Sequence, residues 1–308
     1  MKFFEFFITV FLKIISFLPQ RMQYFVGRSI GSLLYKFLKQ RKGIARWNLK
    51  KCFPEFSTEQ IEKILKKNFC RLGESLFEFL NAFWASDKKI KKLITNFEEI
   101  KDIADNLDSK RGKLILLLHT VNVDMAARAS SLFLPVSGMA KVQSIKILHN
   151  LLDSSRQKFT ERIFRPNEGS DFLSFLKDGK ANLYAPDQDY GYQHSLFIDF
   201  FGHKALTVKF PSILVERTNC EVLLFTLDKK GNSYEASLKK LDLDGKDIET
   251  DLKKINSAAE SYIRRCPDNY LWMHRRFKNR PEGEDSFYPK DLLRNRSVSY
   301  THLRAHET

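Results

Sequence analysis

A histidine and an aspartate five residues apart, His119 and Asp124, are of the types that can form a general base. The apolar run 114–118 before the histidine predicts a buried strand, and residues 125–134 predict a helix. On one continuous helix, side chains five positions apart point about 140° away from each other, so they would not meet. Across a strand-to-helix turn they can meet. We therefore expect His119 and Asp124 to converge at such a turn, where the pair could serve acyl transfer.

The H-x4-D spacing is weak evidence alone, because it recurs in this sequence. Two further pairs fit it: His194 with Asp199, and His302 with Glu307 if glutamate is allowed. Only His119 closes a predicted buried strand. A structural alternative stays open, in which Asp124 or Asn122 caps the helix and His119 is a hydrogen-bonded turn residue.

A second acidic pair, Asp187 and Asp189, follows the apolar segment 181–185 in the motif PDQDYG. Both side chains are candidates for lining a pocket at the end of that predicted strand. A turn stabilised by side-chain caps explains them equally well.

Apolar segments and helical stretches alternate through the body of the chain, which predicts an α/β domain over residues 56–293. The expected architecture is a mixed central sheet flanked by helices. Expected strands are 136–140, 181–185, 196–201 and 221–227, and expected helices are 145–159 and 170–177, with one or two helices over 56–84 that begin after Ser57.

The N-terminal segment 3–18 is strongly apolar with one narrow polar stripe, so we expect residues 1–20 to be a membrane-anchor helix that spans the bilayer or lies in its interface. Residues 21–55 are basic, and no acidic residue occurs between Phe6 and Pro54. The positive-inside rule then keeps the body in the cytoplasm, with the basic collar against anionic lipid. Nucleic acid is a competing partner for this charge, but no nucleic-acid motif occurs.

Several other patterns exclude alternatives. Gly27 to Gly31 match the G-x-S-x-G nucleophile elbow around Ser29, but they lie in a basic, predicted helix without a preceding buried strand, so a small-xxx-small packing face is the better interpretation. Phosphate-binding glycine loops are missing, and four scattered cysteines lack zinc spacing and suit a reducing compartment. The tail 294–308 resembles a translated sequencing adapter, with a natural disordered terminus as the alternative.

Four blocks resemble the bacterial lipid A biosynthesis late acyltransferases, of the lysophospholipid acyltransferase-like superfamily. The blocks are HTVNVD (119–124), YAPDQDYG (184–191), FIDFFGHKALTVKFPSILVERTNC (197–220) and YLWMHRRFKNRPEG (270–283). The resemblance covers nearly all of residues 1–290 and implies a glycerol-3-phosphate acyltransferase-like fold. The segment 120–123 departs from the usual family wording, and Lys141 stands where an arginine is expected, which leaves donor and acceptor preference open.

The resemblance implies transfer of a fatty acyl chain from acyl carrier protein to a hydroxyl of a Kdo-bearing lipid A precursor, at the cytoplasmic face of the bacterial inner membrane. His119 would be the base and Asp124 would fix its tautomer. No metal or organic cofactor is implied. Arginines that could bind the phosphates and acidic sugars of the acceptor are Arg156, Arg162, Arg275 and Arg276, each of which could also be an ordinary surface charge. Two alternatives remain: acylation of another glycolipid or amino-lipid, and a non-catalytic membrane-binding protein.

Overall fold

The computed structural model describes residues 10, 12–144 and 146–293. Its centre is a six-stranded sheet with the strand order β3-β2-β4-β1-β7-β8, in which all neighbours are parallel except the antiparallel pair β7 and β8. The strands are β1 (Lys113–Leu116), β2 (Val136–Met139), β3 (Thr160–Phe164), β4 (Ala181–Tyr184), β7 (Glu221–Lys230) and β8 (Ser233–Leu241). The predicted mixed α/β architecture is therefore confirmed.

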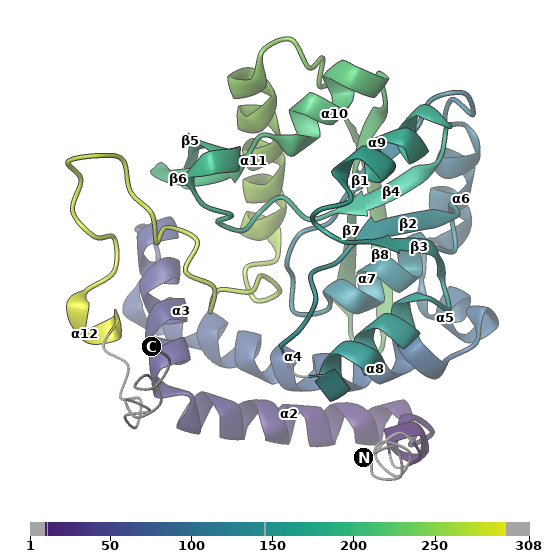
Figure 1. Cartoon of the computed structure of the whole chain (residues 1–308). Coiled ribbons are helices and arrows are strands. Elements are labelled where there is room, and N and C mark those ends of the chain that lie inside the picture. Colours follow the sequence, from purple (N-terminus) through teal and green to yellow (C-terminus); the bar gives the residue numbers. More distant parts are fainter. Residues whose placement is uncertain (1–9, 11, 145, 294–308) are drawn as a thin grey trace, which may run out of the picture.

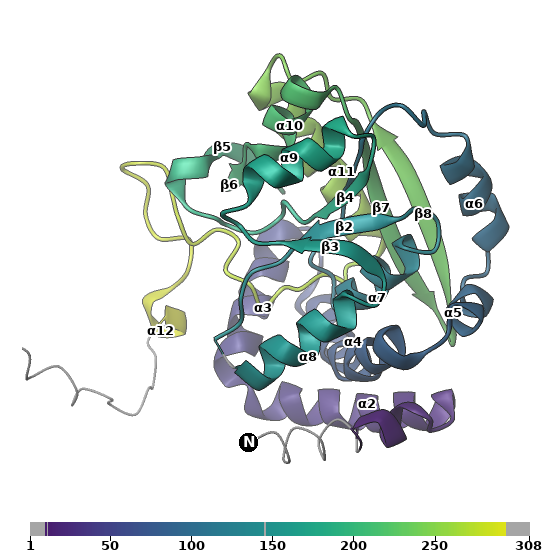
Figure 2. The ribbon, with the colours of Figure 1, turned by 45° about the vertical axis from the view of Figure 1, so that its right-hand side comes forward.

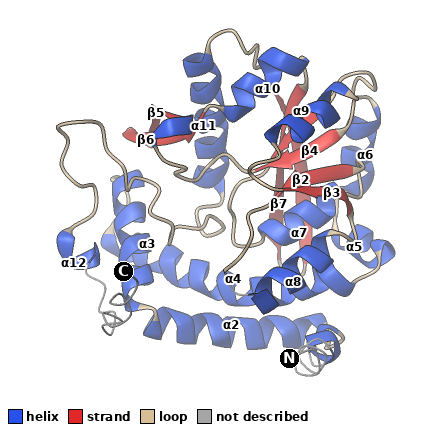
Figure 3. Cartoon of the chain, viewed as in Figure 1, coloured by secondary structure: helices blue, strands red, loops and turns tan. Residues whose placement is uncertain are grey.

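Helices cover both faces of the sheet (Figures 1 and 3). In order, they are α2 (Gln20–Phe37), α3 (Lys39–Cys52), α4 (Thr58–Trp84), α5 (Asp87–Leu93), α6 (Phe97–Asp105), α7 (Val123–Ser130), α8 (Lys146–Arg156), α9 (Gly169–Lys177), α10 (Phe210–Thr218), α11 (Ile248–Arg265) and α12 (Lys290–Leu293). Residues 57–84 begin with a capping box between Ser57 and Gln60 and form one helix, α4.

Strand β1 is buried on both faces, as its unbroken apolar run predicts. Leu114 and Leu116 belong to the core cluster that contains residues of α3, α9, α10 and α11, whereas Ile115 belongs to the cluster that contains residues of α5, α6 and α7. Alternate side chains of a strand point to opposite faces, so one apolar sequence supplies both cores. Ile44 and Leu49 of α3 share the first cluster with the sheet, so the basic region 21–55 contributes to the core of the α/β fold.

Most of the segment 196–201 is a strand, as predicted, but it does not join the central sheet. It lies in β5 (Ser195–Phe200), which pairs only with β6 (His203–Val208) in a separate antiparallel hairpin. A two-residue turn joins the strands, with Phe201 and Gly202 both at positive φ. Strict alternation of strands and helices therefore predicts this part of the connectivity wrongly.

Helix α2 packs closely along α4 at the base of the molecule in Figure 1, and Figure 2 shows the same pairing after rotation. A Cβ atom on Gly31 would lie 2.2 Å from the carbonyl oxygen of Phe69, and one on Gly73 would lie 1.9 Å from that of Gly27. Only glycine permits such an approach, which confirms the predicted small-residue packing face. Ser29 lies within this helix and donates to the carbonyl of Phe25 (3.0 Å), so no nucleophile elbow exists there.

Half of the expected anchor over residues 1–20, namely residues 1–9 and 11, lies outside the described residues, as does the whole tail 294–308. Among the residues that are described, none of the helices combines the length and the apolar character that a membrane span requires.

Candidate active site

Two parallel strands bring the central pair of the site together. In β1 and β4, Leu116 is paired with Tyr184, and the Leu117 amide still donates to the Tyr184 carbonyl (2.9 Å) beyond the strand ends. His119 and Asp187 each follow three residues after these paired positions. Side chains that leave neighbouring parallel strands at the same level meet at the carboxyl edge of the sheet, where ligands of α/β folds bind.

Asp187 holds His119 through both of its carboxylate oxygens. Oδ1 lies 2.6 Å from the imidazole Nδ1, and Oδ2 accepts a hydrogen bond from the His119 backbone amide (2.9 Å). The two contacts fix the ring relative to its own backbone and place the proton on Nδ1. Nε2 is therefore the ring nitrogen that is left for a substrate.

Each partner shifts the other's pKa. Burial alone would lower the pKa of His119, but the charge and hydrogen bond of Asp187 outweigh it, so the pKa lies above its ordinary value of 6.5. Burial would likewise raise the pKa of Asp187, but His119, its backbone amide and the charge of Arg276 outweigh burial, so this pKa is lowered. Asp187 is therefore ionised at neutral pH and favours the imidazolium form of His119.

Asp124 makes a different contact from the one that the sequence suggests. Its Oδ1 accepts hydrogen bonds from Nη2 (2.8 Å) and Nε (3.2 Å) of Arg156, at the end of α8. The contact expected between Asp124 and the imidazole is made by Asp187 instead. Asp124 lies in the first turn of helix α7, near enough for its charge to raise the pKa of His119, although less than Asp187 does.

A cavity of about 910 Å³ opens in front of His119. Its volume is within the range of roughly 300–1,000 Å³ that is typical of ligand sites. Apolar side chains form most of its wall, among them Leu117, Met139, Ile163, Leu183 and Phe210. Charged and titratable groups on the wall are His119, Asp124, Lys141, Arg156, Tyr184, Tyr190, His194 and Lys209. The cavity wall is thus mostly apolar, with a smaller set of polar groups that includes His119.

Arg156 is the one predicted substrate-binding residue on the described cavity wall. Arg162 points elsewhere, pairing with Glu168 (3.0 Å) and Asp171 (2.6 Å), and Arg275 is exposed on the surface. Neither arginine lines the cavity. Charge and sequence position do not show in which direction a side chain points, and both residues fit the alternative interpretation of ordinary surface charges.

Asp189 and Arg276 are buried outside the cavity wall, where they stabilise the segments around the site. Asp189 accepts hydrogen bonds from the Gly191 amide (3.0 Å) and the Asn279 side chain (2.9 Å), so it stabilises a turn. Arg276 donates to the Leu206 carbonyl and to the Thr207 hydroxyl (2.9 Å). Neither side chain lines the cavity, but the charge of Arg276 helps to keep Asp187 ionised.

The C-terminal block 270–283, together with Asn269 before it, also positions the histidine, which sequence reasoning missed. The Leu271 amide donates to the His119 carbonyl (3.0 Å), the Val121 amide donates to the Asn269 carbonyl (2.8 Å), and the Tyr270 hydroxyl donates to the Asp187 carbonyl (3.3 Å). His274 belongs to this block, and burial lowers its pKa to about 4. The family-specific sequence of this block was the available signal of its importance, but the sequence does not show which residues the block packs against.

Comparisons with known proteins identify the family of the chain. Residues 1–279 match the family model described as bacterial lipid A biosynthesis acyltransferase. The chain is 30% identical over 275 residues to the lipid A biosynthesis palmitoleoyltransferase of Escherichia coli K12, covering 88% of this chain and 90% of that protein. It is 29% identical over 278 residues to the lipid A biosynthesis lauroyltransferase of the same organism, with the same coverage of 88% and 90%. The chain therefore belongs to the bacterial lipid A biosynthesis acyltransferase family.

Proposed function

We propose that this protein transfers a fatty acyl chain from acyl carrier protein to a hydroxyl of a Kdo-containing lipid A precursor, in lipopolysaccharide biosynthesis at the cytoplasmic face of the inner membrane. The observation that carries the proposal is a histidine fixed by a buried carboxylate on the wall of a largely apolar cavity. Membership of an O-acyltransferase family supports the reaction class.

His119 acts as the general base in this proposal. Nε2 takes the proton of the acceptor hydroxyl while the oxygen attacks the thioester carbonyl, and Asp187 stabilises the imidazolium that forms. The tetrahedral intermediate then collapses, the carbon–sulfur bond breaks, and His119 returns the proton to the leaving thiolate. The ester product and a free thiol result, without a covalent enzyme intermediate.

Arg156 supplies positive charge to the same cavity, and Asp124 holds its guanidinium in place. A fixed cation near the reacting carbonyl would stabilise the oxyanion, or it would bind a phosphate of the acceptor. In this proposal the two carboxylates have different partners: Asp187 orients the base, His119, and Asp124 orients Arg156.

The acyl chain fits the apolar part of the cavity. Leu117, Met139, Ile163, Leu183 and Phe210 offer a surface that takes a hydrocarbon chain out of water, which is favourable at roughly 0.8 kcal/mol for each buried methylene. Lys141 and Lys209 on the same wall are suited to the anionic groups of the donor or the acceptor.

The test uses membranes from cells that express the full chain, with acyl carrier protein thioesters as donor and a lipid A precursor as acceptor. His119→Ala should lower transfer roughly 100-fold or more. His203→Ala is the control, because His203 contacts the Lys51 carbonyl and lies off the cavity wall. An unchanged rate in His119→Ala would reject the base. Lipid mass spectrometry of a deletion strain tests the acceptor: lipid A should lose one acyl chain, and a loss from another lipid instead would reject lipid A.

A further inference from the structure

Helix α2 exposes an apolar stripe on the side that faces away from the protein. Its inner residues, Gln23, Tyr24, Gly27 and Gly31, are buried against the body. Large apolar side chains on the outer side are exposed, and Phe25 and Phe37 have 74% and 70% of their surface accessible. The stripe consists of Met22, Phe25, Val26, Leu33 and Phe37. At the helical rotation of about 100° per residue, these five positions fall on one side.

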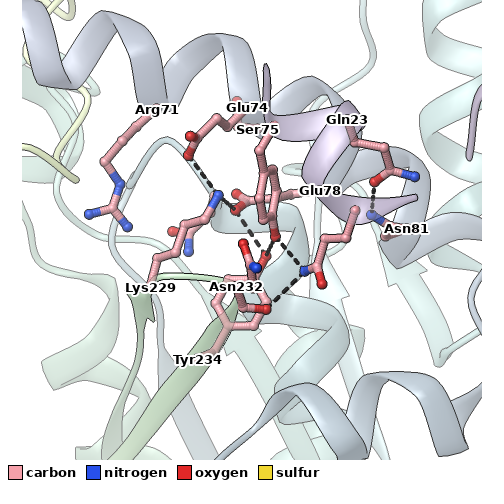
Figure 4. Close-up of polar contacts among 12 residues, drawn as sticks. Gln23, Arg71, Glu74, Ser75, Glu78, Asn81, Lys229, Asn232 and Tyr234 are labelled. Carbon is pink, nitrogen blue, oxygen red and sulfur yellow. Dashed lines mark hydrogen bonds and ion pairs between the residues drawn. The ribbon is translucent and has the colours of Figure 1, made fainter. Parts of the chain in front are cut away.

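Polar contacts fix the rotation of α2 (Figure 4). The Asn81 side chain donates to Gln23 Oε1 (2.8 Å), and the Gln20 side chain donates to the Asn232 carbonyl (2.9 Å). The Tyr24 and Tyr234 hydroxyls lie 3.3 Å apart. Rolling the helix to bury its apolar stripe would break these contacts and leave their groups unpaired, which is costly in a buried place. The stripe is therefore held outward.

Basic residues accompany the stripe, and no acidic residue occurs between Gln20 and Phe53. Arg21, Arg28 and Lys36 are exposed on α2. Arg28 pairs with the buried Glu74 of α4 (2.5 Å), which leaves Arg21 and Lys36 as the charges that favour an anionic surface. A helix with an exposed apolar face and an unbalanced positive charge complements the surface of an anionic bilayer, which offers hydrocarbon beneath negative headgroups.

We propose that the outer face of α2 docks onto anionic phospholipid, with the helix lying in the plane of the membrane interface. The apolar stripe enters the headgroup and acyl boundary, and the basic side chains contact lipid phosphates. The inference rests on the membrane location given in the proposed function, adds the surface that makes the contact, and can fail while the acyl-transfer reaction stands.

The experiment places an amino acid with an environment-sensitive fluorescent side chain at position 33 of the full-length protein. Vesicles contain phosphatidylglycerol and phosphatidylcholine, with lipids that carry quenchers on their acyl chains. We expect a blue shift of emission and loss of fluorescence on vesicle binding. The matched control carries the same side chain at position 103, because Ile103 is also an exposed apolar residue but lies on α6. It should remain unquenched.

Charge is tested separately with Lys36→Gln, which should weaken vesicle binding roughly fivefold, the factor that one basic side chain contributes near an anionic surface. Lys239→Gln, an exposed change on β8, should have no effect.

A probe at position 33 that stays in water while the protein binds vesicles would overturn the proposal, because another segment would then be the anchor. A probe already shielded without vesicles would also overturn it and indicate that protein covers the stripe. His119→Ala must leave all of these signals unchanged, which separates docking from catalysis.

Discussion

Asp187 makes two contacts to His119, whereas Asp124 makes its charged contact to Arg156. We therefore expect Asp187→Asn to reduce the rate of acyl transfer more than Asp124→Asn does. Loss of the Asp187 charge removes the stabilisation of the imidazolium, and a change of this kind costs up to about 10⁴-fold in a serine protease. Steady-state rates of both variants, at matched amounts of folded protein, give the comparison. A larger loss in Asp124→Asn would indicate that Asp124 orients the imidazole, as the sequence suggests.

The raised pKa of His119 gives a second expectation. A base must be unprotonated, so kcat/KM should fall with decreasing pH along a limb whose midpoint lies above 6.5. In Asp187→Asn the opposing effect of burial remains while the carboxylate charge is gone, so the midpoint should move down. His274, with a pKa of about 4, stays neutral over this range and does not add to the limb. A midpoint that is the same in both proteins would contradict the coupling of His119 to Asp187.

The sequence singles out the candidate histidine, but it does not single out the carboxylate that contacts it in the structure. Asp124 is close along the chain, whereas Asp187 is 68 residues away and becomes a neighbour only because β1 and β4 are adjacent and parallel in the sheet. The single available clue is that both residues follow an apolar run by a similar interval. Using that clue requires the strand order, which the apolar pattern of each strand does not contain.

Burial patterns within the elements show a similar limit. Phe77, Leu80 and Phe83 of α4 are buried, whereas Leu76 is exposed although it shares a helical face with Leu80 and Phe83. Helix α2 packs against α4 and shifts which side chains are covered. Periodicity identifies an apolar face, but the partner helix decides how wide the buried part of that face becomes.

The buried ion cluster beneath α2 yields a prediction about stability. The Lys229 ammonium lies 2.6 Å from Glu74 Oε2 and 2.9 Å from Glu78 Oε1, and all three side chains are at most 5% exposed (Figure 4). Lys229→Met would leave two buried carboxylates without their common cation, which should lower the free energy of unfolding by about 3–5 kcal/mol. Urea unfolding followed by circular dichroism measures this change.

The neighbouring Lys230 provides the control for that measurement. It pairs with Glu235 at 3.4 Å, and both side chains are more than half exposed. Water screens such a pair, so Lys230→Met should change the free energy of unfolding by less than about 0.5 kcal/mol. Equal losses in the two variants would mean that the cluster around Lys229 has no special role in joining α4 to the sheet.

In the whole molecule, the cavity and the outer face of α2 are two separate surfaces. The cavity opens at the carboxyl ends of β1, β2 and β4, and α2 lies along α4 at the base of the view in Figure 1. The apolar sequence pattern predicts the sheet and its covering helices because burial follows from composition. It does not predict the cavity, since an empty space depends on how side chains from distant elements fail to fill it.

The net charge of +15 should act on the proposed donor, acyl carrier protein, before any chemistry begins. Acyl carrier protein is acidic, so long-range attraction would speed its encounter with this basic protein, and salt would screen that attraction with a Debye length of about 10 Å at 0.1 M. We expect kcat/KM for the carrier-bound thioester to fall roughly tenfold or more from low to high ionic strength. An acyl-pantetheine donor without the carrier protein has little charge to steer and should show a much weaker dependence. If both donors lose the same factor, salt acts on the active site or on the membrane, and the basic surface does not recruit the carrier.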